Sequence, residues 1–144
     1  MNTTSYLQLY LHLVWATWDR LPLVTSGIEE MLYPMLAAKA TELGCRTVAI
    51  GGIEDHVHQL IWLPATVPIA RIARELKGAS AHSINRRGHR ELEFKWQAGY
   101  GAFTLAKHDV ERVAAYVRNQ RAHHKSQRLS ASLESIHDNQ EGIG

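Results

Sequence analysis

Two apolar runs separated by only two residues constrain the fold of this chain more than any other feature of its sequence. Residues 46 to 53 are rich in Val and Ile, residues 56 to 63 are mostly apolar, and Glu54-Asp55 alone joins them. A connection this short allows antiparallel pairing only, since parallel strands need a crossover of a dozen or more residues. The sequence therefore predicts a β-hairpin here.

A strand with alternating side chains comes before this hairpin. From residue 7 to residue 13, leucines alternate with Gln8, Tyr10 and His12, and the pattern continues to Trp15. Successive side chains of a strand point to opposite faces of the sheet, so the leucines share one face and the polar residues share the other. The pattern predicts a half-buried strand.

Helical signals separate and follow these strands. Ser26 is an expected N-cap, with Glu29 three residues later as a capping box requires, and the helix should end at Gly44. Apolar residues from Ile69 onward predict a second helix running toward Gly88. A fourth strand is expected within residues 94 to 105, and a third helix near Asp109.

The resulting order is β-α-β-β-α-β followed by a helix. This order is typical of an α+β fold, the ferredoxin-like split βαβ sandwich, in which helices cover one face of an antiparallel sheet. The last helix comes after the core pattern and is expected as a C-terminal addition. Fold alone does not assign a function.

Length and composition indicate one domain. The chain has 144 residues, and beyond Lys125 polar residues dominate, so we expect a domain over residues 1–125 and a mobile tail over 126–144. No apolar stretch reaches the ~20 residues that span a bilayer, and no cationic leader opens the chain, so a cytoplasmic location is expected. Cys45 is the only cysteine, which excludes an intrachain disulfide and a cysteine-based zinc site.

The basic residues are concentrated in the second half of the chain. Between Arg71 and Arg128 there are 13 of the 16 Lys and Arg against five acidic residues, a formal charge of +8. Such a block attracts polyanions such as nucleic acid, although a solvated set of helix faces gives the same pattern. The residues predicted to contact DNA are Arg71, Arg74, Lys77, Arg86 and Arg87.

His56 and His58 are the candidate metal ligands. One residue apart on a strand, they point the same way with Cα atoms ~7 Å apart, so both imidazoles can reach one cation. Glu54 and Asp55 offer acceptors that fix an imidazole tautomer. Two strand histidines without any ligand remain the alternative.

Tyr116 and Gln120 are the second candidate pair. On one helix they share a face, so a phenol and a neutral oxygen ligand would stand together, flanked by Arg112 and Arg118. Nearby cations favour a phenolate, and a metal on the target phosphate lowers the barrier to attack. A core tyrosine and a surface glutamine are the structural alternative.

Four separated segments together resemble one known family, the single-tyrosine HUH transposases of insertion-sequence 200/605 elements and their palindrome-associated relatives. The similarity runs from about Tyr6 to about Lys125, in the order found in that family. Just before the histidines, Gly52-Ile53-Glu54-Asp55 departs from the family's commonest Met-Pro-Asp pattern. The matching segments are Asp55-His56-Val57-His58, Leu76-Lys77-Gly78-Ala79-Ser80, Trp96-Gln97-Ala98-Gly99-Tyr100 and Tyr116-Val117-Arg118-Asn119-Gln120.

The resemblance implies a function and a set of roles. It implies a transposase that cuts and rejoins single-stranded DNA, in which Tyr116 on a catalytic helix forms a 5′-phosphotyrosine link. His56, His58 and Gln120 would hold Mg²⁺ or Mn²⁺. Hairpin DNA ends are the implied partner, together with a second copy of the chain in a homodimer. Covalent storage of bond energy removes any need for ATP.

Two other functions fit the same residues. A non-catalytic nucleic-acid-binding module would use aromatic residues such as Trp96 and Tyr100 to stack on bases, unless these pack in the core. A phosphodiesterase would use water in place of Tyr116. We assign no catalysis to the remaining histidines of the basic half, which are His82, His89, His108, His123 and His124.

Overall fold

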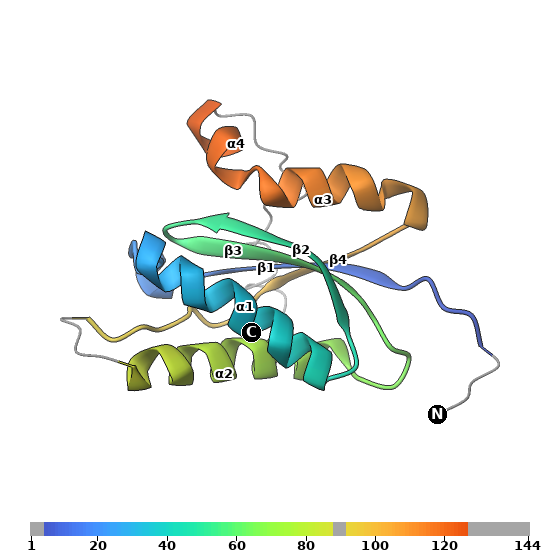
Figure 1. Cartoon of the computed structure of the whole chain (residues 1–144), viewed down its shortest axis with the longest axis horizontal. Coiled ribbons are helices and arrows are strands. Elements are labelled where there is room, and N and C mark those ends of the chain that lie inside the picture. The colour runs from blue at the N-terminus through green and yellow to red at the C-terminus, as the bar shows by residue number, and fades with distance from the viewer. Residues whose placement is uncertain (1–4, 88–91, 127–144) are drawn as a thin grey trace.

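The computed structural model describes residues 5–87 and 92–126, which form one antiparallel sheet with helices on both faces. The sheet has the strand order β2-β3-β1-β4. Helices α1 and α2 lie on one face, and α3 lies on the other (Figure 1). This arrangement confirms the predicted α+β, ferredoxin-like fold with a C-terminal helix added. The elements are β1 (Tyr10–Ala16), α1 (Ser26–Glu42), β2 (Arg46–Ile53), β3 (His56–Trp62), α2 (Ile69–Arg86), β4 (Gly101–Leu105), α3 (Val110–Arg118) and α4 (Gln120–Ser126), with short 3-10 turns η1 (Trp18–Arg20) and η2 (Lys107–Asp109).

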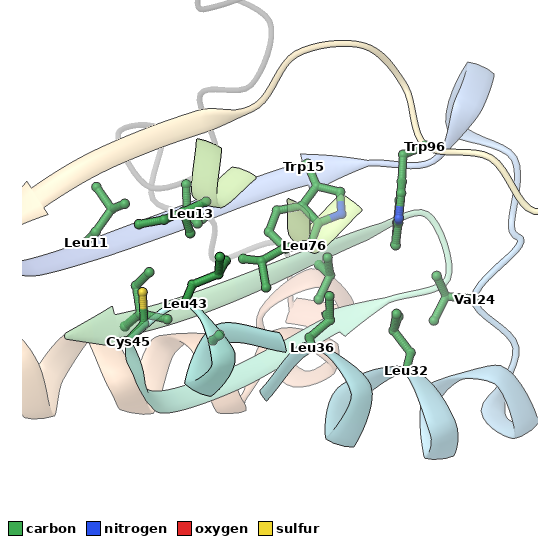
Figure 2. Close-up of a cluster of buried hydrophobic side chains, with 14 of the residues drawn as sticks. Leu11, Leu13, Trp15, Val24, Leu32, Leu36, Leu43, Cys45, Leu76 and Trp96 are labelled. Atoms are coloured by element: carbon green, nitrogen blue, oxygen red, sulfur yellow. The ribbon is translucent and has the colours of Figure 1, made fainter. Parts of the chain in front are cut away.

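Strand β1 is buried on both faces, so the prediction of a half-buried strand was wrong. Leu11, Leu13 and Trp15 belong to the main core beneath α1 and α2, which Figure 2 shows in detail. The alternate residues, including His12, face α3 and are buried as well. The alternation itself was correct. The added helix covers the face that would otherwise meet water.

Helix α1 begins at a different cap from the predicted one. The Oγ1 atom of Thr25 accepts a hydrogen bond from the Ile28 backbone N–H at 3.3 Å, so Thr25 is the N-cap and Ser26 is the first helical residue. The predicted capping box of Ser26 with Glu29 is therefore wrong by one residue. The other end agrees with the sequence: Gly44 follows the helix with φ of 87°, a conformation that glycine adopts readily.

The predicted hairpin of β2 and β3 is confirmed, and its second strand carries His56 and His58. In its register Gly51 lies opposite His58 and Ile53 lies opposite His56. A Cβ atom built on Gly51 would collide with the backbone carbonyl of Val117. Helix α3 therefore rests directly on the backbone of β2 at this point, which only glycine permits.

The expected C-terminal helix is divided in two. Asn119, with φ −103° and ψ 32°, ends α3, and α4 begins at Gln120. Of the predicted tail over residues 126–144, only Ser126 lies within the described residues, and His89 lies outside them. Nowhere in the described segments is a helix both long and apolar enough to cross a membrane.

Candidate active site

The two histidines of β3 lie side by side on the sheet face that α3 covers. His56 and His58 are fully buried, and their ring centroids are 5.1 Å apart. The prediction that both point to one face is therefore correct. Their burial is a second finding: these are not surface imidazoles, and both His56 nitrogens and His58 Nδ1 lie within 3.3 Å of a polar partner.

Asp55 fixes the orientation of His56. The His56 Nδ1 atom lies 2.9 Å from Asp55 Oδ1, and Arg20 Nε donates to Asp55 Oδ2 at 3.3 Å. Burial raises the pKa of Asp55, but hydrogen bonds from His56 and Arg20 together with their charges outweigh it, and the net pKa is lowered. An ionised carboxylate only accepts hydrogen bonds, so Nδ1 carries a proton and Nε2 is left to bind on the other side of the ring.

Gln120 faces that second nitrogen. Its Nε2 atom donates to the Tyr116 carbonyl at 3.1 Å, which directs Oε1 toward His56 Nε2 at 3.3 Å. In neutral His56 these are two lone-pair acceptors facing each other, an arrangement that a cation between them would stabilise. Adjacent ligands of an octahedral Mg²⁺ are about 3 Å apart, because each bond is ~2.1 Å. The separation of the two atoms therefore fits a shared metal.

The full donor set is small but chemically suited to a divalent cation. Two imidazoles and an amide oxygen match Mn²⁺ well, and Mg²⁺ is acceptable once water and phosphate oxygens complete the shell. Within the described residues, no group of three or more His, Cys, Asp or Glu side chains could hold a metal. Gln120, which lies outside those residue types, is therefore the candidate for a third protein ligand.

Tyr116 stands at the rim of the histidine pair. Its half-buried ring meets the His58 ring edge to face at a centroid distance of 6.1 Å, and it stacks on His123 at 4.6 Å. The expected flanking arginines have other partners. Arg118 donates to the Val48 carbonyl at 3.2 Å, and Arg112 pairs with Asp109 at 3.6 Å.

Three further histidines belong to this cluster, and their part in it was not predicted from the sequence. His12 of β1 is fully buried, with Nε2 2.8 Å from His58 Nδ1. His124 of α4 lies 3.2 Å from Gln120 Oε1 and packs its ring on His56 at 4.8 Å. His123 covers Tyr116. The available signals were a histidine among strand leucines and a His-His pair one turn after Gln120.

The other two family-like segments bond to each other, away from this cluster. Lys77 Nζ donates to the carbonyls of Gln97 and Gly99, each at 2.8 Å, and burial lowers its pKa to about 8. Trp96 Nε1 donates to Ser80 Oγ at 3.0 Å within the main core. Trp96 is thus a core residue rather than a base-stacking one. Tyr100 is half-buried and packs against the same core.

The predicted DNA-contacting residues all lie on or directly after α2, on the opposite side of the sheet from Tyr116 (Figure 1). Arg71, Arg74, Arg86 and Arg87 are exposed, whereas Lys77 is half-buried and bonded to the two carbonyls just described. The structure therefore separates the basic helix from the histidine cluster. DNA that touches both must pass around an edge of the sheet.

A cavity lies beside the cluster at the β4 edge. It has a volume of about 370 Å³, and its lining includes His12, Phe103, Asp109 and Arg112. These residues come from β1, β4 and the start of α3. The buried row of histidines therefore ends at an open, partly polar space.

Comparisons with known proteins agree on one family. The family model described as "Transposase IS200 like" matches residues 5–120. The ISDra2 transposase TnpA of Deinococcus radiodurans is 24% identical over 119 residues, which span 78% of this chain and 84% of that protein.

Two solved structures share the fold. A crystal structure of a candidate transposase from Deinococcus radiodurans R1 superimposes with a TM-score of 0.66 at 26% identity, covering 83% of this chain and 96% of the other. A REP-associated tyrosine transposase bound to a REP hairpin gives a TM-score of 0.61 at 17% identity, covering 86% and 73%. The sheet and helices described above are therefore shared with these two proteins.

Proposed function

The chain belongs to the IS200-like transposase family, whose activity is DNA transposition, and from that premise we propose that it cuts and rejoins single-stranded DNA through Tyr116. One observation carries the proposal. Two segments about sixty residues apart, the β3 histidines and the Tyr116–Gln120 region, meet in a single buried cluster, with Gln120 Oε1 3.3 Å from His56 Nε2. A binding module has no need of this convergence.

The proposed reaction conserves bonds and protons. The Tyr116 oxygen forms a bond to a DNA phosphorus while the bond from that phosphorus to the 3′ oxygen breaks. The phenol gives up one proton and the departing 3′ oxygen gains one. A 3′-hydroxyl from another DNA end then reverses the step, breaking the tyrosine-phosphate bond and restoring the phenol. One phosphate ester replaces another, so no ATP is required.

The residues around Tyr116 have distinct proposed tasks. His56, His58 and Gln120 would hold Mg²⁺ or Mn²⁺, whose positive charge would stabilise the negative charge that develops on the phosphate oxygens. Asp55 orients His56, and the Tyr116 carbonyl orients Gln120. Because that carbonyl belongs to the nucleophile itself, a shift of the tyrosine also shifts a metal ligand.

Hairpin DNA is the proposed substrate, supported by the REP hairpin held by a transposase of the same fold. The exposed Arg71, Arg74, Arg86 and Arg87 would neutralise its phosphates. Replacing both Arg71 and Arg74 by Ala should weaken binding and lower the slope of log affinity against log salt by about 2. An unchanged slope would remove α2 from the DNA path.

The decisive experiment measures covalent capture of DNA. Purified protein is incubated with labelled single-stranded hairpins from the DNA flanking its gene, with Mg²⁺ or Mn²⁺, and resolved by denaturing electrophoresis. We expect a protein-DNA adduct that disappears in Tyr116→Phe and with chelator. Tyr100→Phe is the matched control, because the Tyr100 ring packs against the main core beneath α1 and α2. This variant should form as much adduct as the wild type.

Other outcomes identify the rival functions. Cleavage that survives Tyr116→Phe without any adduct would indicate a phosphodiesterase that uses water. Tight hairpin binding without cleavage, across both metals, would indicate a binding module and would leave Tyr116 with a packing role. Either result would contradict the proposed strand transfer.

His56, His58, Tyr116 and Gln120 lie together within one chain, and we propose that Tyr116 acts beside the histidines of its own chain even in the expected homodimer. Mixing Tyr116→Phe protein with His56→Ala protein tests this arrangement. Each variant lacks one half of the site, so the mixture should form no adduct. Activity that reappears on mixing would show that each tyrosine serves the histidines of the partner.

A further inference from the structure

His58 makes a short contact with another histidine. His12 Nε2 and His58 Nδ1 are 2.8 Å apart, and both side chains are fully buried. The ring planes are inclined by only 18°, with centroids 5.0 Å apart. Since the nitrogens are so much closer than the centroids, the rings meet edge to edge. This is the geometry of a well-directed hydrogen bond between two imidazoles.

The direction of this bond decides what His58 can do. A hydrogen bond between two nitrogens contains one proton, so one imidazole donates and the other accepts. If His58 donates from Nδ1, its Nε2 has a lone pair for a cation. If His12 donates instead, neutral His58 carries its proton on Nε2 and cannot bind a metal there.

The packing around His12 keeps its ring in place. His12 lies near the middle of β1, directly opposite Leu60 of β3 and Phe103 of β4. Its ring also contacts the Phe103 ring, at a centroid distance of 5.9 Å. A ring enclosed in this way holds its Nε2 atom against His58, much as Asp55 holds the other histidine.

We propose that His12 is a positioning residue that accepts the Nδ1–H of His58 and so holds His58 in the tautomer whose Nε2 can bind a divalent cation. The inference rests on the proposed function, because it gives His58 the metal-binding role argued above. The two proposed metal ligands would then be oriented by different groups: a carboxylate orients His56 and an imidazole orients His58.

The tautomer can be measured directly on metal-free protein. We expect ¹⁵N NMR at pH 8 with chelator to show His58 protonated on Nδ1 and unprotonated on Nε2, assigned by comparison with His58→Gln protein. The opposite tautomer of His58 would overturn the inference. This measurement needs no DNA and no catalytic turnover.

Substitutions of His12 test the consequence for metal binding. His12→Phe keeps a ring but removes the acceptor, and should weaken Mn²⁺ binding by about 10–100-fold. His12→Gln keeps an acceptor in nearly the same place and should bind Mn²⁺ within about threefold of the wild type. His108→Phe makes the same replacement at an exposed histidine and should bind like the wild type. Mn²⁺ titration followed by electron paramagnetic resonance gives all four affinities, and thermal unfolding checks each fold.

The outcomes separate this inference from the proposed function. The inference would be overturned if His12→Phe bound Mn²⁺ as tightly as the wild type, or if folded His12→Phe and His12→Gln lost the same amount of Mn²⁺ affinity. A wild type that binds no Mn²⁺ would also overturn it. If His12→Phe does not fold, the NMR tautomer and the His12→Gln affinity decide. The expected affinities without any DNA adduct would overturn only the proposed function.

Discussion

The two faces of the sheet are built from different chemistry. Beneath α1 and α2 the buried side chains are almost all apolar, with Leu11, Leu13 and Trp15 contributed by β1. Beneath α3 the same strand contributes His12, and β3 contributes His56 and His58. One strand thus supplies apolar side chains to the main core on one side and, on the other, a buried histidine among apolar neighbours such as Val14. The face beneath α3 also has an apolar cluster of its own, which includes Leu60, Val113 and Val117, so the buried histidines are what distinguishes the two faces.

The covering helices differ in the same way. Helices α1 and α2 have 17 and 18 residues, whereas α3 and α4 have nine and seven. Short helices depend on tertiary contacts for their stability, so we expect α3 and α4 to open more easily than α1 and α2. This difference suits the proposed function, in which the site admits a DNA strand and releases it again.

Damage to the apolar face should affect stability more than chemistry. Trp96→Ala removes a buried indole and its bond to Ser80, and should lower the free energy of unfolding by about 3–5 kcal/mol. Chemical denaturation measures this loss, with Trp18→Ala, whose side chain is exposed, as the control. Folded Trp96→Ala protein should still form the DNA adduct. A normal stability with a lost adduct would reverse the assignment of the two faces.

A substitution at Gly51, where α3 contacts β2, should affect adduct formation more than stability. In Gly51→Ala the new methyl group meets the Val117 carbonyl, so α3 must move, and Tyr116 moves with it. We expect adduct formation to fall by about 100-fold, since displacements near 1 Å have effects of that size. Gly78→Ala is the matched control, because nothing lies within 4 Å of the position that its new methyl group would take. Equal rates in the two variants would show that α3 is not held at Gly51.

Local patterns explain which features could be predicted from the sequence. Three predictions depend only on neighbours in the chain, and all three were correct. They are the alternation in β1, the turn at Glu54-Asp55 and the shared face of His56 and His58. The helix break at Asn119 could not be predicted, because no glycine or proline near it indicates a break. The double burial of β1 could not be predicted either, because it depends on a helix that arrives about one hundred residues later.

Contacts between distant segments explain the rest of the site. His12 meets His58 only because Val14 pairs with His58 in the sheet, and a single sequence does not give that register. Lys77 was predicted to contact DNA because it lies among arginines. Its hydrogen bonds to the carbonyls of Gln97 and Gly99, in a loop about twenty residues away, could not be predicted from the sequence.

Lys77, which lies on the side of α1 and α2, should also make the stability of the protein depend on pH. Burial lowers the pKa of Lys77 to about 8 in the folded state, from an ordinary value of 10.5. Between these values the unfolded chain binds more protons, so this residue makes the protein more stable as the pH rises from 8 toward 10. The gain should be absent in Lys77→Met and present in the control Lys107→Met. A wild type that loses stability relative to Lys77→Met over this range would contradict the shift.

The smallest expected effect concerns the attachment of α4 to the hairpin turn. Arg121 pairs with Glu54 at 2.6 Å and with Glu29 at 2.9 Å, all on partly exposed side chains, so Arg121→Ala should cost at most about 1 kcal/mol. The hydrogen bond from Arg121 lowers the pKa of Glu54, so this stabilisation is present at neutral pH and is lost as the pH falls through that pKa. Denaturation at pH 7 and in acid measures the difference, with Arg87→Ala as the control. Because α4 carries Gln120, a large fall in Mn²⁺ affinity with so small a loss of stability would show that these ion pairs position the polar face rather than stabilise the fold.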